Sequence, residues 1–466
     1  MKLAHALACL ALVALPALAT ELPMPKDLPP LGPDKPLPIP KIREEKLANG
    51  QQLWIVKRSG FPQISAVLAV RGGTASDPPE AEGISELLSD TLRTGTPTRS
   101  ARAVAEELQA AGAELIVNSS DDAFYLYVSG PSDKASSMLE VLADVARNAN
   151  FPEAEVALAR TNALQQLSER ESEPDFLLQK AFSRALFGAH PYHTTHATRP
   201  TIEHATRDQL VREHARRFRP DHALLVVAGE LDPSQIKADV KRLFGSWQNS
   251  GTAIAATPPA PPNPPRRMLS VARPDSVQSA IAVGRIVPNR SSPDYYPLLV
   301  AESICCGAFS SRLVANIRED KGYTYSPGSY VGAMEQGGVF RISADVRNEV
   351  TGATLNEIHH ELDRMATTRP TDEELSRAKH LQVGYYLLGN QIQSSVAVTL
   401  AVYWVNRLPA DEIGKFVTKV NAVGVDDVLR VGRKYLTSRA QTVVVVGDEK
   451  LIADELAPFG ETAPAP

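Results

Sequence analysis

The chain has 466 residues, which is too long for one hydrophobic core and predicts at least two domains. Hydrophobic residues make up 43% and charged residues 22%, as in ordinary globular proteins. The formal net charge of -5 gives no reason to expect binding to nucleic acid or to an anionic membrane.

The N-terminus predicts export from the cytoplasm. Lys2 precedes an apolar run that ends in the small-x-small pattern Ala-Leu-Ala, which is typical of a cleaved signal peptide. We assign residues 1–19 to this signal and expect a periplasmic protein. No later apolar run is long enough to predict a membrane span.

Two cysteines remain in the mature chain, and they are the neighbours Cys305 and Cys306. We expect them to pack as small apolar side chains and not to bridge each other, because a bridge between neighbours strains the backbone.

Proline-rich segments divide the chain. Residues 20–41 form an extended lead-in, and residues 251–268 read as a semi-rigid linker between two lobes. The lobes are residues 42–250 and 269–460, followed by a short tail at 461–466.

The two lobes show matching orders of strands and helices. In the first, we predict strands at 51–58, 64–70, 123–130 and 223–231, and helices at 81–93, 99–111 and 133–149. In the second, we predict strands at 277–285, 338–346 and 442–448, and helices at 295–305, 310–318 and 350–366. This mixture predicts an α+β fold of two related lobes, each a mixed or antiparallel sheet packed with helices.

The stretch "GISELLSDTLRTGT" opens the helix predicted at 81–93. Glu86, Ser89 and Asp90 fall at i, i+3 and i+4, so they share one helical face. Three polar groups between leucines suggest a site or the remains of one.

Four stretches in chain order resemble signatures of the pitrilysin/insulinase family of zinc peptidases, which includes mitochondrial processing peptidases. They are "RGGTASDPPEAEGISELLSDTLRTGT", "GAHPYHTTHATRPT", "GAFSSRLVANIREDKGYTYS" and "RLPADEIGKFVTKVNAVGVDDVLRVGRKYL". The resemblance covers nearly the whole mature chain. It implies that the two lobes, joined by the linker, form one half of a clamshell.

Catalytic members of the family carry H-x-x-E-H, with two zinc-binding histidines, a glutamate base and a distal glutamate ligand. The resemblance places Glu86 and Asp90 at the histidines, Ser89 at the base and Gln166 at the distal ligand, with Gln165 the next best match. A serine cannot accept a proton from a bound water near neutral pH as a carboxylate does. We therefore interpret these positions as a degenerate metal site that binds no metal, on a solvated helix face. A weak cation site with oxygen ligands is the alternative.

The second lobe keeps the pair that the family uses at the substrate. Arg318 and Tyr325 have the spacing R-x6-Y, and a guanidinium and a phenol hydroxyl can stabilise a developing oxyanion. We name this pair as the candidate catalytic residues. Without a catalytic role, Arg318 is expected to form a surface ion pair with Glu319 or Asp320, and Tyr325 is expected to be a half-buried strand residue.

Some family members work as pairs in which only one subunit has H-x-x-E-H, and this chain resembles the other subunit. The resemblance implies the non-zinc subunit of a heterodimeric periplasmic metallopeptidase, inactive as a peptidase on its own and without a cofactor. Zinc is expected in a homologous partner subunit with intact H-x-x-E-H. The substrates are expected to be unfolded peptides added to a sheet edge around "ELIVNSSDD".

Two other functions stay open at this point. The first is a non-catalytic peptide-binding or scaffolding protein of the same fold, which need not keep the Arg318 and Tyr325 pair. The second is a stand-alone metallopeptidase that uses an unusual site at Glu86 and Asp90.

The histidine-rich stretch "HPYHTTH" has no carboxylate at a set spacing and is not expected to bind a metal.

Overall fold

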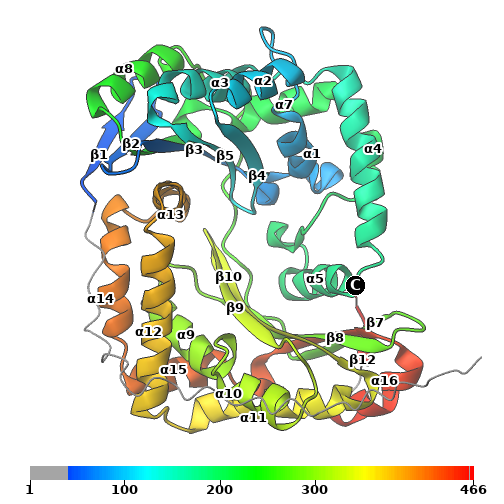
Figure 1. Ribbon diagram of the computed structural model, residues 1–466. Coiled ribbons are helices and arrows are strands. Elements are labelled where there is room, and N and C mark those ends of the chain that lie inside the picture. Colours follow the sequence, from blue (N-terminus) through cyan, green and yellow to red (C-terminus); the bar gives the residue numbers. More distant parts are fainter. Residues whose placement is uncertain (1–39, 461, 466) are drawn as a thin grey trace, which may run out of the picture. The chain divides into compact units, whose positions relative to one another are not determined.

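The structure is a computed structural model that describes residues 40–460 and 462–465 (Figure 1). The predicted signal peptide, and all but the last two residues of the lead-in, lie outside these residues. Two six-stranded mixed sheets are present, each packed with helices. The predicted α+β fold of two related lobes is confirmed.

The first sheet lies in the first lobe, and its two edge strands are β1 and β4. Its strands, in spatial order, are β1 (Ile42–Lys46), β2 (Gln52–Lys57), β6 (Ala223–Gly229), β3 (Gln63–Arg71), β5 (Ala123–Pro131) and β4 (Glu114–Ser119). β2 and β6 are parallel, with Trp54 opposite Val226, and the other neighbours are antiparallel. β6 is buried along its whole length, which explains its unbroken apolar run. The outer side of β4 has no strand partner within the sheet.

The second sheet repeats this arrangement in the second lobe. Its strands, in spatial order, are β12 (Thr462–Pro464), β7 (Arg267–Ala272), β11 (Thr442–Gly447), β8 (Gln278–Val287), β10 (Gly337–Arg347) and β9 (Gly328–Met334). The strands β7, β11, β8, β10 and β9 take the places that β2, β6, β3, β5 and β4 have in the first sheet. β9 is therefore the counterpart of the edge strand β4.

Helices fill most of the remaining chain. In the first lobe they are α1 (Ile84–Thr91), α2 (Ala101–Ala110), α3 (Ala135–Asn148), α4 (Glu153–Arg170), α5 (Pro174–Phe187), α6 (Arg199–His204), α7 (Arg207–Arg217) and α8 (Pro233–Phe244). In the second they are α9 (Tyr295–Glu302), α10 (Arg312–Val314), α11 (Thr351–Thr367), α12 (Asp372–Gly389), α13 (Gln393–Val405), α14 (Phe416–Asn421), α15 (Val425–Tyr435) and α16 (Glu449–Leu456). π-helical turns follow α9 at Ser303–Gly307 and α10 at Ala315–Asp320.

Each lobe covers one face of the other lobe's sheet. α13 of the second lobe packs on β3 and β6, where Leu400 and Trp404 join a core with Trp54. In return, α5 of the first lobe packs on β8 and β11, where Phe182 joins a core with Val444 (Figure 1). The lobes are therefore joined by two shared cores as well as by the linker.

One helical stretch in the described residues, Tyr295–Asp320, is long and apolar enough to cross a membrane by length and composition alone. The protein buries 72% of the apolar window in this stretch. Leu298 and Ile317 of the stretch belong to the second-lobe core. Such burial is the ordinary reason for a long apolar helix in a two-lobed core.

Candidate functional site

The start of α1 is anchored to the end of α7 by a buried ion pair. Gly83 precedes α1 in the left-handed conformation, with φ 85°, which favours glycine. The Asp77 carboxylate accepts hydrogen bonds from the Gly83 N–H at 3.1 Å and from Ser85 Oγ at 2.5 Å. Arg217, which is fully buried, donates to the same carboxylate at 2.7 Å. Burial raises the pKa of Asp77 to about 6, although Arg217 acts to lower it.

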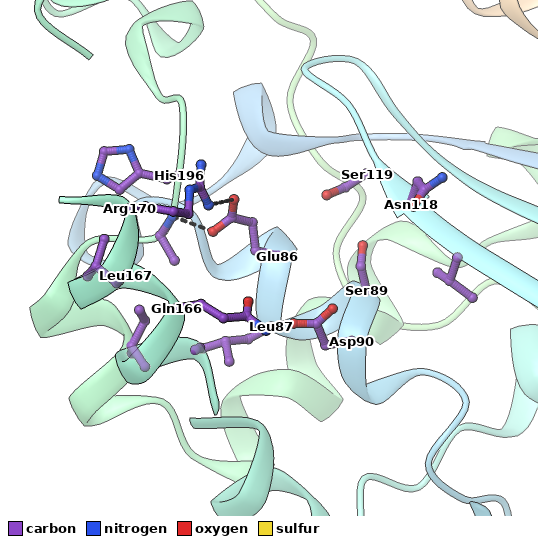
Figure 2. Close-up of a pocket in the computed structure, with 14 residues that line it drawn as sticks. Glu86, Leu87, Ser89, Asp90, Asn118, Ser119, Gln166, Leu167, Arg170 and His196 are labelled. Atoms are coloured by element: carbon purple, nitrogen blue, oxygen red, sulfur yellow. Dashed lines mark hydrogen bonds and ion pairs between the residues drawn. The ribbon is translucent and has the colours of Figure 1, made fainter. Parts of the chain in front are cut away.

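The polar face of α1 lines a pocket of about 300 Å³ (Figure 2). Glu86, Ser89 and Asp90 come from α1, and the predicted distal position Gln166 comes from α4. The structure therefore brings all four degenerate metal-site positions together. The other polar side chains of the lining are Asn118 and Ser119 of the edge strand β4, Arg170 of α4, and His196.

The three α1 side chains differ in how their oxygens are paired. Glu86 Oε2 accepts a hydrogen bond from the Ala197 N–H at 2.7 Å, and Oε1 lies 3.7 Å from Arg170 Nη1. Ser89 is only 6% exposed, and its Oγ has no hydrogen-bond partner among the described residues. Asp90 is solvent-accessible, and no hydrogen bond or ion pair to it is found in the described part of the chain.

Asp90 has a perturbed carboxyl group. The surrounding protein raises its pKa by desolvation, and the negative charge of Glu86 raises it further, against the lowering effect of Arg93. The pocket therefore disfavours a second negative charge beside Glu86 and would favour a cation there.

These residues do not fit a zinc centre. Hydrolytic zinc sites use imidazole nitrogens with a carboxylate and keep one open position. Here Glu86 is already engaged, and Ser89 and Gln166 offer only neutral oxygens. His196 lines the pocket, but its Nδ1 lies 2.9 Å from Thr195 Oγ1 and its ring packs on Phe176 at 4.5 Å. Within residues 40–460 and 462–465, no three His, Cys, Asp or Glu side chains are grouped to hold a metal ion.

Sequence reasoning missed Arg170 and His196 as lining residues. Arg170 follows Gln166 at i+4 on α4, so the helical spacing contained a signal for it. His196 reaches the pocket only through the fold, from the loop before α6. Burial, and then the charges of Lys180 and Arg170, lower the pKa of His196 to about 4.

A second pocket of about 340 Å³ shares Glu86 and Ser119 with the first and reaches β9 at Tyr330 and Met334. It lies where the two lobes meet. Asp121 lines it, and burial followed by the charge of Asp122 raises the pKa of Asp121 to about 7.

Hydrogen bonds beside this second pocket connect the two lobes. The Tyr192 hydroxyl donates to Asp122 Oδ1 at 2.7 Å, and it accepts from the Gln336 N–H at 3.1 Å. Asp122 Oδ2 accepts from the Glu335 N–H at 2.7 Å. The turn between β9 and β10 is thereby fixed to the first lobe.

The predicted pair Arg318 and Tyr325 lies together on the second lobe. The Arg318 guanidinium carbon is 4.9 Å from the Tyr325 ring centre and 4.5 Å from that of Phe309. Both aromatic rings are exposed, Tyr325 at 81% and Phe309 at 71%. Arg318 Nε also lies 3.3 Å from Glu319 Oε1, which is the surface ion pair expected if Arg318 has no catalytic role. Neither Arg318 nor Tyr325 lines the two pockets, and their role stays a prediction.

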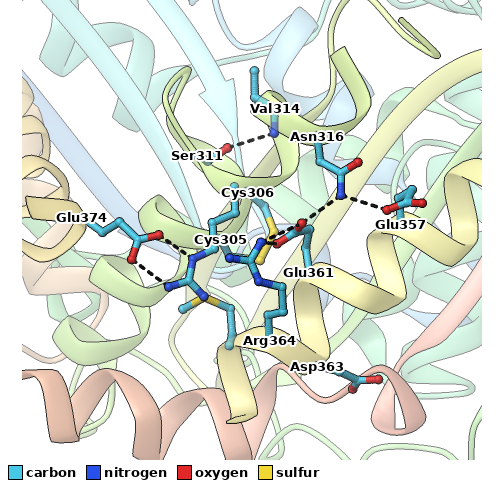
Figure 3. A network of polar contacts seen from close by, with 12 residues as sticks. Cys305, Cys306, Ser311, Val314, Asn316, Glu357, Glu361, Asp363, Arg364 and Glu374 are labelled. Atoms are coloured by element: carbon cyan, nitrogen blue, oxygen red, sulfur yellow. Dashed lines mark hydrogen bonds and ion pairs between the residues drawn. A yellow bond between two sulfur atoms is a disulfide. The ribbon is translucent and has the colours of Figure 1, made fainter. Parts of the chain in front are cut away.

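Side-chain pairs brace the π-helical turn that carries Arg318 (Figure 3). Asn316 donates to Glu357 and to Glu361 of α11, at 2.9 Å each. Arg312 forms two hydrogen bonds to Glu374 of α12, at 2.6 and 2.8 Å. These contacts fix the turn to α11, and they fix α10, which precedes the turn, to α12.

The expectation that Cys305 and Cys306 do not bridge is wrong. Their sulfurs are joined in a disulfide within the π-helical turn Ser303–Gly307 (Figure 3). The prediction considered only the strain of a bridge between neighbours. In the folded protein both side chains are fully buried in the same core, which holds the two sulfurs side by side.

Glu302, the last residue of α9, is a buried carboxyl group near this turn. It is 5% exposed, and its Oε1 accepts a hydrogen bond from Ser329 Oγ of β9 at 2.6 Å. Burial raises the pKa of Glu302 to about 7 from 4.5. Because the folded-state pKa is raised, the stability that this group contributes is present below pH 4.5 and is lost as the pH rises through about 7.

We therefore expect Glu302→Gln to remove this pH dependence. Above about pH 8 the variant should exceed the wild type in free energy of unfolding by about 3 kcal/mol, and near pH 4 the difference should be small. Urea unfolding across this range measures both. The matched control is Glu373→Gln on α12, where the side chain is 80% exposed. A constant difference between Glu302→Gln and the wild type at every pH would contradict the prediction.

Family models match two parts of the chain. The model described as insulinase (peptidase family M16) matches residues 55–198, which include the pocket face of α1. The model described as the peptidase M16 inactive domain matches residues 204–382, which include Arg318 and Tyr325. Together the two matches cover more than half of the chain.

Curated relatives are similar over most of their length. An uncharacterized zinc protease of Mycobacterium tuberculosis is 28% identical over 385 residues, covering 80% of this chain and 86% of the relative. An uncharacterized zinc protease of Rickettsia felis is 24% identical over 409 residues, covering 86% of this chain and 96% of the relative.

Solved structures share the fold. A protease from Helicobacter pylori aligns with a TM-score of 0.83 at 21% identity, covering 88% of this chain and 99% of that one. A peptidase M16 inactive domain from Pseudomonas fluorescens aligns with a TM-score of 0.80 at 23% identity, covering 87% and 98%. The chain belongs to the insulinase family of peptidases, family M16.

Proposed function

We propose that the chain is the non-zinc-binding subunit of a heterodimeric periplasmic metallopeptidase. Its partner is a homologous subunit that carries intact H-x-x-E-H and the zinc. One contrast supports this proposal: the pocket at Glu86, Ser89 and Asp90 does not fit zinc, whereas Arg318 and Tyr325 lie together on the second lobe. The signal peptide predicted at residues 1–19 supports the periplasmic part of the proposal.

In this proposal the chain contributes substrate binding and transition-state stabilisation. An unfolded peptide adds to the free edge of β4, where backbone N–H and C=O groups are available for an extra strand. Arg318 and the Tyr325 hydroxyl donate hydrogen bonds to the substrate oxygen that gains negative charge during hydrolysis. No step of hydrolysis is assigned to the first-lobe pocket of this chain.

Reconstitution tests the proposal. The mature protein is assayed alone, and mixed with a homologue from the same genome that has intact H-x-x-E-H, on a library of quenched fluorescent peptides. We expect no activity from either protein alone. The mixture should form a complex and cleave peptides, and a chelator should abolish the cleavage.

Other outcomes separate the alternatives. Chelator-sensitive activity of this protein alone, with stoichiometric zinc, would contradict the proposal and support a stand-alone peptidase. Peptide binding without complex formation or cleavage would contradict it in favour of a non-catalytic binding protein.

A further inference from the structure

The pocket on α1 keeps acceptor groups that the protein itself does not use. Ser89 lines the pocket and is 94% buried, and its buried Oγ finds no partner within the described residues. The Asp90 carboxylate, one residue further on, is also without an ion pair there. A buried hydroxyl without a partner costs folding free energy, so a ligand that supplies the missing hydrogen bond is favoured.

The charges around these groups favour a cationic ligand. Arg170 is the cation that lines the pocket, and its guanidinium is held by Glu86 at 3.7 Å and stacks over Phe176 at 4.7 Å. Among the described residues, the Asp90 carboxylate therefore has no free cation in the pocket lining, and Arg93, outside the lining, is the only cation that acts on its charge. Figure 2 shows Ser89 and Asp90 away from the Glu86–Arg170 contact.

The shape of the lining favours a primary ammonium on an apolar stem. Val117 of β4, Leu167 of α4 and Ile202 of α6 supply apolar walls for methylene groups. An ammonium carries three N–H donors, and Asp90, Ser89 and Ser119 offer acceptor oxygens around one space.

We propose that this pocket binds the primary ammonium group of a peptide held along β4, supplied by a lysine side chain or by the peptide's N-terminal amine. β4 contributes Asn118 and Ser119 to the lining, so a strand added at its edge passes the pocket mouth. The proposal rests on the proposed function to the extent that β4 is the peptide-binding edge. It assigns a selective role to residues that no longer fit a metal.

Peptide titrations test this assignment on the full mature protein in the presence of a chelator. The probe is a short unstructured fluorescent peptide, N-acetylated, with one central lysine. It is compared with the same peptide carrying norleucine, which keeps the length of the side chain without the ammonium. We expect the lysine peptide to bind about tenfold more tightly, as for one hydrogen-bonded ion pair, and the preference to shrink with salt. A third peptide, with norleucine and a free N-terminus, separates the two sources of the ammonium.

Substitutions in the pocket test whether it causes the preference for the lysine peptide. Asp90→Asn should abolish the lysine preference and leave binding of the norleucine peptide unchanged. Ser89→Ala should reduce the preference by about threefold without lowering the free energy of unfolding, since the hydroxyl it removes is unpaired. The matched control is Asp133→Asn, a carboxylate 73% exposed in the short turn before α3.

The failures are distinguishable. Equal binding of lysine and norleucine peptides would overturn the ammonium pocket and leave peptide binding intact. A lysine preference that survives Asp90→Asn would overturn it as well, and so would a preference that needs an added divalent metal. Absence of binding by every peptide, alone and with the partner subunit, would overturn the proposed function together with the pocket.

Discussion

Replacing Arg217 with methionine is expected to lower the free energy of unfolding by about 3–5 kcal/mol. Arg217 is fully buried at the end of α7, with Asp77 and Glu213 as its carboxylate partners. Its Nε also donates to the Gly72 carbonyl at 2.9 Å. Removing the guanidinium leaves the buried Asp77 carboxylate without a counterion, while Glu213 keeps only its pair with Arg216, and an uncompensated buried charge costs far more than a lost exposed pair.

The loss should extend to the pocket as well as to stability. Asp77 receives both Arg217 and the N–H groups at the start of α1, so its carboxylate positions the helix that carries Glu86, Ser89 and Asp90. Urea unfolding with circular dichroism measures the free energy. The control is Arg102→Met on α2, where an exposed pair with Glu106 is worth no more than about 0.5 kcal/mol. Equal effects of the two substitutions would contradict the prediction.

The central strands β6 and β11 were predictable from local sequence, whereas β7 and the edge strand β9 were not. β6 and β11 are buried on both faces, so an unbroken apolar run marks each of them. β7 and β9 have no such run: β9 contains glycines and is mostly half-buried. Their strand conformation comes from pairing with β11 and β10, which local periodicity does not report.

The candidate site was also predictable from the sequence only in part. The i, i+3, i+4 spacing predicted that Glu86, Ser89 and Asp90 share a face, which the structure has. The same spacing favoured a solvated face, yet Ser89 is 6% exposed. The pocket walls from β4 and α4 close over it, and sequence spacing on α1 carries no information about those elements.

In the second lobe, the resemblance to the family predicted a pair of residues that sequence spacing alone could not predict. Residues at R-x6-Y have no fixed relation in space on local grounds alone. The fold nevertheless brings Arg318 against Tyr325. Phe309, whose ring also lies near the Arg318 guanidinium, had no sequence signal, because its position depends on how the turn before α10 folds.

In the reconstituted complex, Arg318→Ala and Tyr325→Phe are each expected to lower kcat by about tenfold to a thousandfold, as for the loss of one oxyanion donor. Tyr325→Phe is the more specific test of the two substitutions. It keeps the ring that stacks on Arg318 and removes only the hydroxyl. A fall in kcat with this variant therefore reports hydrogen-bond donation and not the loss of the stack.

Matched controls and a second readout separate catalysis from assembly. Tyr323→Phe removes a hydroxyl two residues away, on a ring that packs against the second-lobe core, and should leave kcat unchanged. Complex formation, followed by size-exclusion chromatography, should be the same for all three variants. If Arg318→Ala abolishes the complex, Arg318 serves docking and not the transition state. Wild-type kcat in both Arg318→Ala and Tyr325→Phe would contradict the role assigned to the pair, because a group that stabilises the oxyanion cannot be removed without slowing the step that forms it.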